Sequence, residues 1–456
     1  MYKIIFYYPA SEKENSGIEV LYSPLSLAYL STHTPDYYKK ELYDEYVGDD
    51  LDPIVVNADI VAMSPLTSGI KRAYRVSDIL RQRGIICVVG GAHVSAMTEE
   101  ALVHFDSVIV GEGERPWKEF LNDFENNSIK KTYFGRMDVC LEDLGVPDRK
   151  MIHPNYHFQS VNTSRGCPFN CSFCYLTVFK NRKYRTIPHE TVLMDLENLR
   201  IEPIIVVTDE NFIGYSLKDY ENRKDLLKKM INRKFRFIWG CQASLNIADD
   251  PDLMDLMYQS GCRAVFIGFE STNAEDLKEI KKKQNGNVDY RDIVQTIHKH
   301  KLAVIASCII GLDHQHNNYH KQLIRDLKKM KVDFVRVFIM TSWPGTPLND
   351  RLREEGRLIE DWDRSRKDIP NIHYKNYTHE ELITARKEVM DSFFNFLNVL
   401  IIISRWVFID RTLIMLFIKM FFRNRVSERI RNKRALKFSL QNKYSIPQVA
   451  LEEIQL

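Results

Sequence analysis

The sequence lacks the features that mark most specialised classes of protein. Its 456 residues carry 64 Lys and Arg against 61 Asp and Glu, a formal net charge of +3, so nothing in its charge predicts a nucleic-acid partner. It has no low-complexity tract and no repeat of solenoid length. The apolar run before Pro9, residues 4–8, is shorter than the about 7–15 residues of a signal-peptide core. We therefore expect a cytoplasmic globular protein.

Cysteine is scarce as well. Eight cysteines in a chain of this length are too dilute for a disulfide scaffold, so we expect thiols or metal ligands. Five of them stand alone and are expected to be small buried hydrophobic side chains: Cys87, Cys140, Cys241, Cys262 and Cys308. The other three, Cys167, Cys171 and Cys174, fall within eight residues of one another.

Short Val- and Ile-rich runs alternate with helix-period segments from residue 3 to about residue 340, which is typical of βα units and parallel sheets. A first series predicts a doubly wound α/β domain over residues 1–125, with strands at residues 3–8, 60–63, 85–89 and 107–110. Residues 126–159 are polar and without clear periodicity, and we expect a linker there.

A second series predicts six βα repeats over residues 160–350, which suits an open or partial barrel because a closed one has eight. Its strands are expected near residues 161–164, 203–208, 237–242, 264–268, 304–310 and 334–340. In either kind of α/β architecture, ligands bind at the C-terminal ends of the strands.

Residues 351–456 form a predicted helical C-terminal region of different composition. The uncharged run 392–404 has 13 residues, short of the about 18 needed to cross a bilayer. Residues 419–437 contain eight Lys and Arg against one Glu. A basic, apolar end of this kind either packs as a helical cap on the barrel or lies at an anionic membrane surface, and both alternatives remain open here.

The three clustered cysteines directly follow a predicted strand, at spacings of four and three residues. Thiolates hold iron–sulfur clusters, and a four-iron cluster with three protein thiolates leaves one iron open to another ligand. A zinc site would need a fourth Cys or His, and His189 has no second histidine three to five residues beyond it. The spacing therefore favours an iron–sulfur cluster over zinc.

This loop resembles that of the radical S-adenosylmethionine (radical SAM) superfamily, which has the form CxxxCxΦC with an aromatic residue, here Phe173, before the last cysteine. The resemblance implies a TIM-like partial barrel in which Cys167, Cys171 and Cys174 bind a [4Fe-4S] cluster. In that family the open iron chelates S-adenosylmethionine, and an electron from the cluster cleaves it to a 5′-deoxyadenosyl radical. Phe173 and Tyr175 are expected beside the adenosine.

Other positions similar to the family fall at predicted strand ends. Residues 208–212 resemble the stretch that receives the methionine amino group, although the usual Gly-Gly-Glu is absent. Residues 268–271 look like the family's GxES motif, and residues 309–311 are similar to the segment that flanks adenine. The S-adenosylmethionine contacts implied in this way are Asp209, Glu210, Gln242, Glu270, Ser271, Ile309 and Gly311.

Three polar or glycine-containing loops follow strands of the first domain, where glycine lets a backbone approach a ligand closely. No GxGxxG or P-loop motif is present. The loops resemble those of the Rossmann-like cobalamin-binding domain that is fused to many radical SAM enzymes. The cobalamin contacts implied are Ser64, Pro65, Leu66, Thr67, Gly90, Gly91, Ala92, His93, Gly111, Glu112 and Gly113.

The sequence differs from the classical cobalamin-binding module in the loop that contacts the lower face of the cobalt. The classical cobalamin module has an Asp-x-His-x-x-Gly loop, whereas residues 44–49 here read Asp-Glu-Tyr-Val-Gly-Asp and Tyr46 stands in place of the histidine. We expect cobalamin to bind without a histidine ligand, its lower face meeting the 64–67 loop. A degenerate domain that binds no cobalamin is the alternative.

The resemblance implies a cobalamin-dependent radical SAM enzyme, foremost a C-methyltransferase acting on an unactivated carbon and supplied by an external low-potential electron donor. The alternatives are a radical cyclase or carbon–carbon bond-forming enzyme, and an iron–sulfur electron-transfer or binding protein without radical chemistry. Residues 343–347 and the apolar C-terminal region favour a hydrophobic substrate such as a lipid, tetrapyrrole or natural product. Peripheral contact with a membrane is expected if the basic C-terminal face is free.

Overall fold

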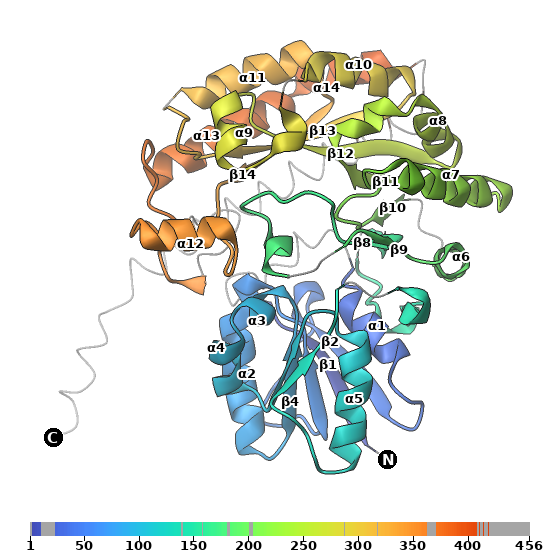
Figure 1. The fold of residues 1–456 in the computed structure, drawn as a ribbon, viewed down its shortest axis with the longest axis vertical. Helices are drawn as coiled ribbons and strands as arrows, with labels where there is room; N and C mark the ends of the chain where they lie inside the picture. Colours follow the sequence, from blue (N-terminus) through green and yellow to red (C-terminus); the bar gives the residue numbers. More distant parts are fainter. Residues whose placement is uncertain are drawn as a thin grey trace. The chain divides into compact units, whose positions relative to one another are not determined.

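Parallel βα units account for most of the described chain, in agreement with the predicted alternation of strands and helices. The computed structural model describes residues 2–10, 23–137, 140–156, 158–179, 183–199, 204–286, 288–316, 318–362 and 371–407, together with residues 410, 414 and 418. The chain divides into two units, residues 1–392 and 393–456, and the first unit contains both predicted α/β domains (Figure 1).

The first domain has a parallel sheet of six strands in the order β2-β1-β3-β4-β5-β6. The strands are β1 (Lys3–Tyr8), β2 (Lys39–Asp44), β3 (Ile60–Met63), β4 (Ile86–Gly90), β5 (Ser107–Val110) and β6 (Thr132–Phe134). The helices are α1 (Ser26–Thr32), α2 (Ile70–Gln82), α3 (Ala92–Ala96), α4 (Thr98–His104) and α5 (Glu114–Glu125).

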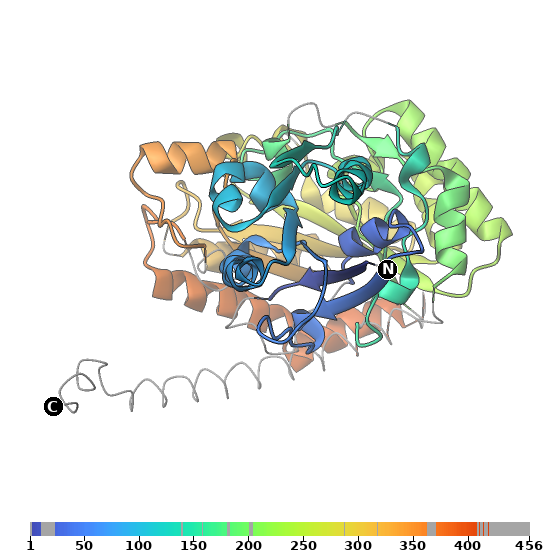
Figure 2. The same ribbon diagram turned by 90° about the horizontal axis from the view of Figure 1, so that it is seen from below.

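Helices cover both faces of this sheet because the chain leaves β1 toward β2 and then returns to the other side of β1 at β3. In Figure 1, α2 and α4 lie on one side of the strands and α1 and α5 on the other. Figure 2, seen from below, shows the same arrangement of blue and cyan helices around the strands. The predicted doubly wound fold is confirmed.

Helix α2 shows how the sequence specifies this packing. Its apolar residues Ile70, Ala73, Val76 and Leu80 recur at helical spacing, and all four are completely buried. They share a core with Val61 of β3. Burial of a Val, Ile or Leu side chain contributes about 1.5–3 kcal/mol, so this stripe holds α2 against the sheet.

Two strands of the first sheet were not predicted, because they lie at its edges and carry little apolar surface. β2 has the sequence KKELYD, and most of its side chains are at least partly exposed. β6 has three residues and pairs with β5. Because β6 belongs to the sheet, the domain boundary expected near residue 125 falls inside the first domain, and part of the expected linker is strand.

The second sheet is also parallel, with the order β14-β13-β12-β11-β10-β7. Its strands are β7 (Gln159–Val161), β10 (Ile204–Val207), β11 (Ile238–Ala243), β12 (Cys262–Glu270), β13 (Ala303–Ile310) and β14 (Phe334–Ile339). The two outermost strands do not pair with each other, so the six predicted βα repeats form a partial barrel. The strand predicted near residues 161–164 is divided between β7 and β8 (Ser164–Arg165), and β8 pairs antiparallel with β9 (Arg185–Thr186).

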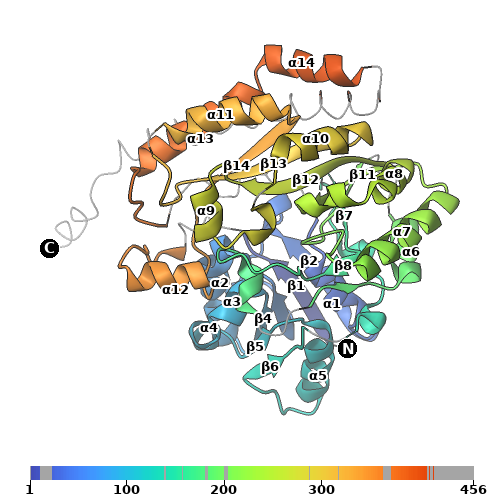
Figure 3. The ribbon, with the colours of Figure 1, turned by 45° about the horizontal axis from the view of Figure 1, so that its top comes forward.

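Helices cover the outer face of the second sheet, as Figure 3 shows for α7, α8, α10 and α11. The helices of this domain are α6 (His189–Glu197), α7 (Leu217–Asn232), α8 (Pro251–Gln259), α9 (Ala274–Glu279), α10 (Tyr290–Lys299) and α11 (Tyr319–Met330). Helix α7 begins with a capping box, in which Ser216 and Asp219 exchange side-chain and backbone hydrogen bonds.

The chain continues past residue 350 with α12 (Pro347–Glu354), α13 (His379–Phe393) and α14 (Phe396–Trp406). Leu352, Leu358 and Ile372 pack with Ile309 and Met340 of the barrel, so this part of the expected C-terminal region belongs to the barrel core. Among the described residues, no single helix is long and apolar enough to cross a membrane, and only α13 and α14 taken together reach that length and composition. Residues 419–437, which carry the predicted basic face, lie outside the described residues.

Candidate functional site

The three clustered cysteines lie in the loop between β8 and β9. In Figure 1 this green segment lies between the second sheet and the first domain. Gly166 leads into the loop with a φ of +83°, and a Cβ there would come within 2.3 Å of the carbonyl oxygen of Lys183, so only glycine fits. The Ser172 amide donates to the carbonyl of Ile280 (3.0 Å), which ties the loop to the segment after α9.

Cys171 is buried, whereas Cys167 and Cys174 are partly exposed, and the three thiols lie close enough to affect one another's titration. Burial, together with the neighbouring thiols of Cys171 and Cys167, raises the pKa of the Cys174 thiol to about 12. Among the described residues, no three His, Cys, Asp or Glu side chains converge closely enough to hold a single metal ion. A four-iron cluster instead binds each thiolate on a separate iron, so three separated thiols in one loop suit it.

Glu210 holds the two ends of the cysteine loop together. Its carboxylate accepts hydrogen bonds from the Gly166 amide and the Tyr175 hydroxyl, both at 3.1 Å. Gly166 directly precedes the first cysteine of the loop and Tyr175 directly follows the last. Burial raises the pKa of Glu210. The predicted site residues Glu210 and Tyr175 thus lie at the cluster loop and are bound to each other.

Lys282 and Gln284 border the cysteines but were not predicted. The Lys282 ammonium pairs with Glu270 at 2.7 Å, and both side chains are largely buried. Burial opposes the charge of Lys282, but Glu270 and the thiols of Cys171 and Cys167 raise its pKa overall. Gln284 Nε2 donates to the Cys171 sulfur at 3.5 Å. In the sequence, both residues belong to a lysine-rich stretch that resembles an ordinary solvated surface, so no local signal marks them.

Glu270 owes its position to two backbone features at the end of β12. Its own φ is +62°, a left-handed conformation that is uncommon for a residue with a side chain. A Cβ on Gly268 would come within 2.3 Å of Glu270 Oε1 and 2.6 Å of Lys282 Nζ. The glycine of the predicted GxES-like motif therefore leaves room for the Glu270–Lys282 pair.

Two residues that were predicted to contact S-adenosylmethionine form hydrogen bonds with other residues of the protein. The fully buried Asp209 carboxylate accepts from the Thr163 amide (2.7 Å), the Thr163 hydroxyl (2.5 Å) and the Ser164 hydroxyl (2.6 Å). The buried Ser271 hydroxyl donates to Asp276 at 2.5 Å and also contacts the Tyr319 hydroxyl at 2.7 Å. The structure therefore places Asp209 and Ser271 in supporting roles rather than at a ligand surface.

The remaining barrel predictions lie near the cysteine loop or at the same strand ends. Phe173 packs against the apolar cluster that includes Ile309 of β13. Gly311 has a φ of +95°, and a Cβ there would be 2.9 Å from the Tyr374 ring. Gln242, near the end of β11, has an exposed side chain. Phe173 and Ile309, two of the residues predicted to contact S-adenosylmethionine, thus lie in the same apolar cluster.

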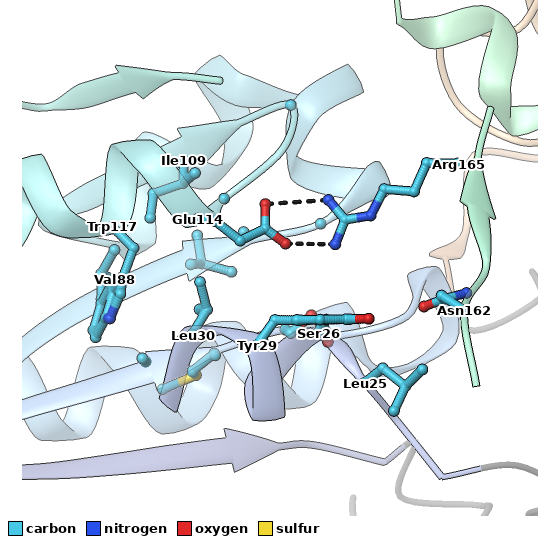
Figure 4. A pocket seen from close by; sticks show the side chains of 18 residues that line it. Leu25, Ser26, Tyr29, Leu30, Val88, Ile109, Glu114, Trp117, Asn162 and Arg165 are labelled. Atoms are coloured by element: carbon cyan, nitrogen blue, oxygen red, sulfur yellow. Dashed lines mark hydrogen bonds and ion pairs between the residues drawn. The ribbon is translucent and has the colours of Figure 1, made fainter. Parts of the chain in front are cut away.

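A cavity of about 250 Å³ lies at the C-terminal ends of the strands of the first domain (Figure 4). Five predicted cobalamin contacts line it: Ser64, Gly90, Gly91, Gly111 and Gly113. Its walls are mainly apolar, with Val88, Ile109 and Trp117 among them, and Asn162 and Arg165 of the second domain complete the lining. An apolar cavity bordered by glycine backbone and a serine hydroxyl fits the nucleotide tail of cobalamin, whereas a whole corrin ring would extend beyond it.

The other predicted cobalamin contacts do not line this cavity: Pro65, Leu66, Thr67, Ala92, His93 and Glu112. His93 is buried, with Nε2 3.8 Å from Glu100 and its ring edge-on to Trp362. Tyr46 follows the edge strand β2 and contacts the ring of Tyr8, so the 44–49 loop is not part of the cavity either. The lining residues that sequence reasoning missed include Tyr29, Glu114 and Arg165.

The isolated cysteines behave largely as predicted. Cys87, Cys241, Cys262 and Cys308 are buried. Cys140 is exposed, which corrects the prediction for that residue, because it lies in the polar segment between the two domains and has no apolar run around it.

Comparisons with known proteins agree with this geometry. A model of the Radical SAM superfamily matches residues 161–327, and a model of the B12 binding domain matches residues 51–121. The chain is 28% identical over 351 residues to bacteriochlorophyllide d C-12(1)-methyltransferase of Chlorobaculum tepidum, covering 75% of this chain and 76% of the relative. It is 26% identical to hopanoid C-2 methylase of Rhodopseudomonas palustris, covering 80% of this chain and 70% of the relative.

Among solved structures, the cobalamin-dependent S-adenosylmethionine radical enzyme OxsB shares the fold, with a TM-score of 0.67 and 18% identity over 86% of this chain and 67% of that one. The chain is therefore a radical SAM enzyme that carries a B12-binding domain. The relatives named above are a methyltransferase and a methylase, and the two matched domains imply a [4Fe-4S] cluster, S-adenosylmethionine and cobalamin as cofactors.

Tyr46, which stands in place of the cobalt-binding histidine of the classical module, predicts that no histidine binds cobalt. None of the described residues that line the cavity is a histidine, and residues 11–22, which follow β1 and lie outside the described residues, contain none in the sequence. We expect cobalamin to bind with neither its own dimethylbenzimidazole base nor a histidine on cobalt. The cob(II)alamin form of the protein should then give an electron paramagnetic resonance spectrum without nitrogen superhyperfine splitting. Splitting from an axial nitrogen, or no uptake of cobalamin, would contradict this expectation.

Proposed function

We propose that the enzyme transfers a methyl group to an unactivated carbon of a hydrophobic small molecule. By name, the relatives reported above methylate a bacteriochlorophyllide and a hopanoid. When bound, the cofactors supply both a methyl donor and a radical that removes a hydrogen atom from carbon. No acid or base of the protein is obligatory for that reaction, so the residues of the chain act by binding and positioning.

One observation carries this proposal: residues of both cofactor-binding domains line the same cavity. Ser64 and Gly91 come from strand ends of the first domain, whereas Asn162 and Arg165 come from the stretch that leads into the cysteine loop. A substrate that reacts with both cofactors must be reachable from both domains. Cobalamin held in this cavity would contact the stretch that leads into the cysteine loop, which supports joint action of the two cofactors and disfavours two independent binding modules.

The residues around the cysteine loop hold the loop and its thiols in position. Glu210 fixes both ends of the loop, and Gln284 donates to the Cys171 sulfur. The Glu270–Lys282 pair places a buried positive charge beside the thiols. A positive charge at this position favours thiolates over thiols, which are the form that binds iron.

Labelled methyl transfer tests the proposed function. The anaerobically reconstituted protein, given a low-potential reductant and S-adenosylmethionine with a deuterated methyl group, is incubated with hydrophobic extracts of the host, and the products are analysed by mass spectrometry. We expect 5′-deoxyadenosine together with a product that carries the label. Formation of 5′-deoxyadenosine with an unlabelled, cyclised or coupled product would favour the radical cyclase alternative. Absence of 5′-deoxyadenosine would favour an electron-transfer protein.

We also propose that the enzyme works in the cytoplasm at the surface of a membrane, where such substrates reside. Large apolar side chains of α14 are exposed, including Phe396, Leu397 and Ile401. The sequence continues with the basic residues 419–437, and each Lys or Arg near an anionic surface contributes up to about 1 kcal/mol.

Sedimentation with liposomes tests this attachment. The full chain is expected to sediment with anionic liposomes at low salt, to be released at high salt, and to ignore neutral liposomes. The double variant Leu397→Ser/Ile401→Ser is expected to bind less, whereas Val103→Ser, which changes an exposed valine of α4, serves as the matched control. A full chain that remains in solution with anionic liposomes at low salt would contradict membrane attachment.

A further inference from the structure

The short ribbon that flanks the cysteine loop presents two arginines side by side. Strands β8 and β9 pair antiparallel, with Arg165 directly opposite Arg185. Residues directly opposite each other in an antiparallel pair extend from the same face, and two like charges there destabilise the pair. The ribbon is therefore stable in this form only if negative charge lies against that face.

The negative charge comes from the first domain. Arg165 makes a two-pronged ion pair with Glu114, at 2.6 and 3.2 Å. Arg185 makes a second one with Glu112, at 2.5 and 3.0 Å. Glu112 also lies 3.6 Å from Arg165, so the two pairs form one network. Each of the four side chains is less than a fifth exposed.

This network stands between the two cofactor regions. On one side, Glu114 and Arg165 line the cavity of the first domain, and Figure 4 shows their two parallel contacts across its mouth. On the other side, Gly166 alone separates Arg165 from the cluster ligand Cys167. The Arg165 guanidinium also lies 5.2 Å from the centre of the Tyr29 ring, which belongs to the same cavity. Within the described part of the chain, the ion pairs and the ring contact of the Arg165 side chain are all with the first domain, while its backbone leads into the cysteine loop.

We propose that the network of Glu112, Glu114, Arg165 and Arg185 is a positioning device that fixes the cysteine loop, and with it the cluster, relative to the cobalamin-binding domain. Paired forks of arginine and carboxylate restrict orientation as well as distance. Buried ion pairs add little net stability compared with apolar packing but specify one arrangement among several. Two cofactors that act on one substrate molecule require such a fixed separation. This inference rests on the cofactors alone and holds whichever substrate the enzyme methylates.

Pulsed dipolar electron paramagnetic resonance on the frozen holoenzyme measures this separation, between the reduced cluster and cob(II)alamin. The wild type is expected to give one narrow distance distribution. The double variant Glu112→Gln/Glu114→Gln is expected to give a broad distribution of cluster–cobalt distances, with iron and cobalamin contents unchanged. A role in stability alone would lower the melting temperature without changing the distance distribution.

The matched control is the double variant Glu119→Gln/Asp143→Asn, which also replaces two carboxylates by amides. It does so at two exposed pairs, Glu119 with Lys130 in the first domain and Asp143, in the segment between the domains, with Arg115. It is expected to keep the narrow distribution. If the first double variant fails to bind its cofactors, each single variant is measured, and each must broaden the distribution. A wild-type distribution in either single variant measured in this way, or in the double variant, would overturn the proposal.

Discussion

Replacing Cys171 with alanine is expected to abolish assembly of the iron–sulfur cluster and all activity that depends on it. Two remaining thiolates cannot hold a four-iron cluster, and Cys171 is the buried member of the set, contacted by Gln284. The same loss is expected for Cys167→Ala and Cys174→Ala. Iron and sulfide analysis, the brown absorbance of the anaerobically reconstituted protein and the yield of 5′-deoxyadenosine measure the effect.

Cysteines outside the loop provide the control. Cys140→Ala changes an exposed thiol and Cys262→Ala a buried one, and neither residue lies in the cysteine loop. Both variants should retain full iron content and chromophore. Normal iron content in the Cys171→Ala protein would refute the assignment of the cluster ligands.

Asp209→Ala is expected to destabilise the protein by about 3–5 kcal/mol, because it leaves a buried cation without its compensating charge. Arg223, which is completely buried, donates to the Thr163 hydroxyl at 2.7 Å, and that hydroxyl contacts the Asp209 carboxylate. The substitution also removes the acceptor of the Thr163 amide. Equilibrium denaturation of the apo-protein measures the loss.

A second aspartate of the barrel serves for comparison. Asp225 is exposed and pairs with Lys229 at 3.4 Å, so Asp225→Ala should change the free energy of unfolding by no more than about 1 kcal/mol. If Asp209→Ala instead unfolds like the wild type but loses affinity for S-adenosylmethionine, Asp209 is a ligand contact, as the resemblance implies, and its supporting role is refuted.

The sequence predicted the central strands of both sheets closely because those strands are buried on both faces. β1, β3 and β5 have the expected bounds, and their apolar runs stand out from their surroundings. The edge strands β2 and β6 have no such run, since half of each strand faces solvent. A boundary derived from fading periodicity therefore fell before the last strand of the first sheet.

The site was predictable where its chemistry is contiguous in the sequence. The three cysteines and the glycines at strand ends stand out in the sequence because one short loop or one strand end supplies each group, and four of the predicted glycines line the cavity. Lys282 could not be predicted in this way, because its partner Glu270 lies twelve residues away and no sequence motif includes the lysine. Likewise, Glu112 was expected at cobalamin, but its carboxylate is bound by Arg185, 73 residues later in the chain. Only the fold shows such pairs.

The Glu210 carboxylate, which joins the residues before and after the cysteines, has a consequence for the assembly of the cluster. A free loop must give up conformational entropy to wrap a metal centre, at a cost of about 1–2 kcal/mol for each backbone residue that becomes ordered. Here the hydrogen bonds from Gly166 and Tyr175 to Glu210 fix the residues on either side of the three cysteines. The protein makes these hydrogen bonds through its own groups, so they lower the part of that cost that cluster binding must supply. Its affinity for the cluster then depends on the rigidity of the barrel, and mutations distant from any thiol can weaken iron binding by loosening those two ends.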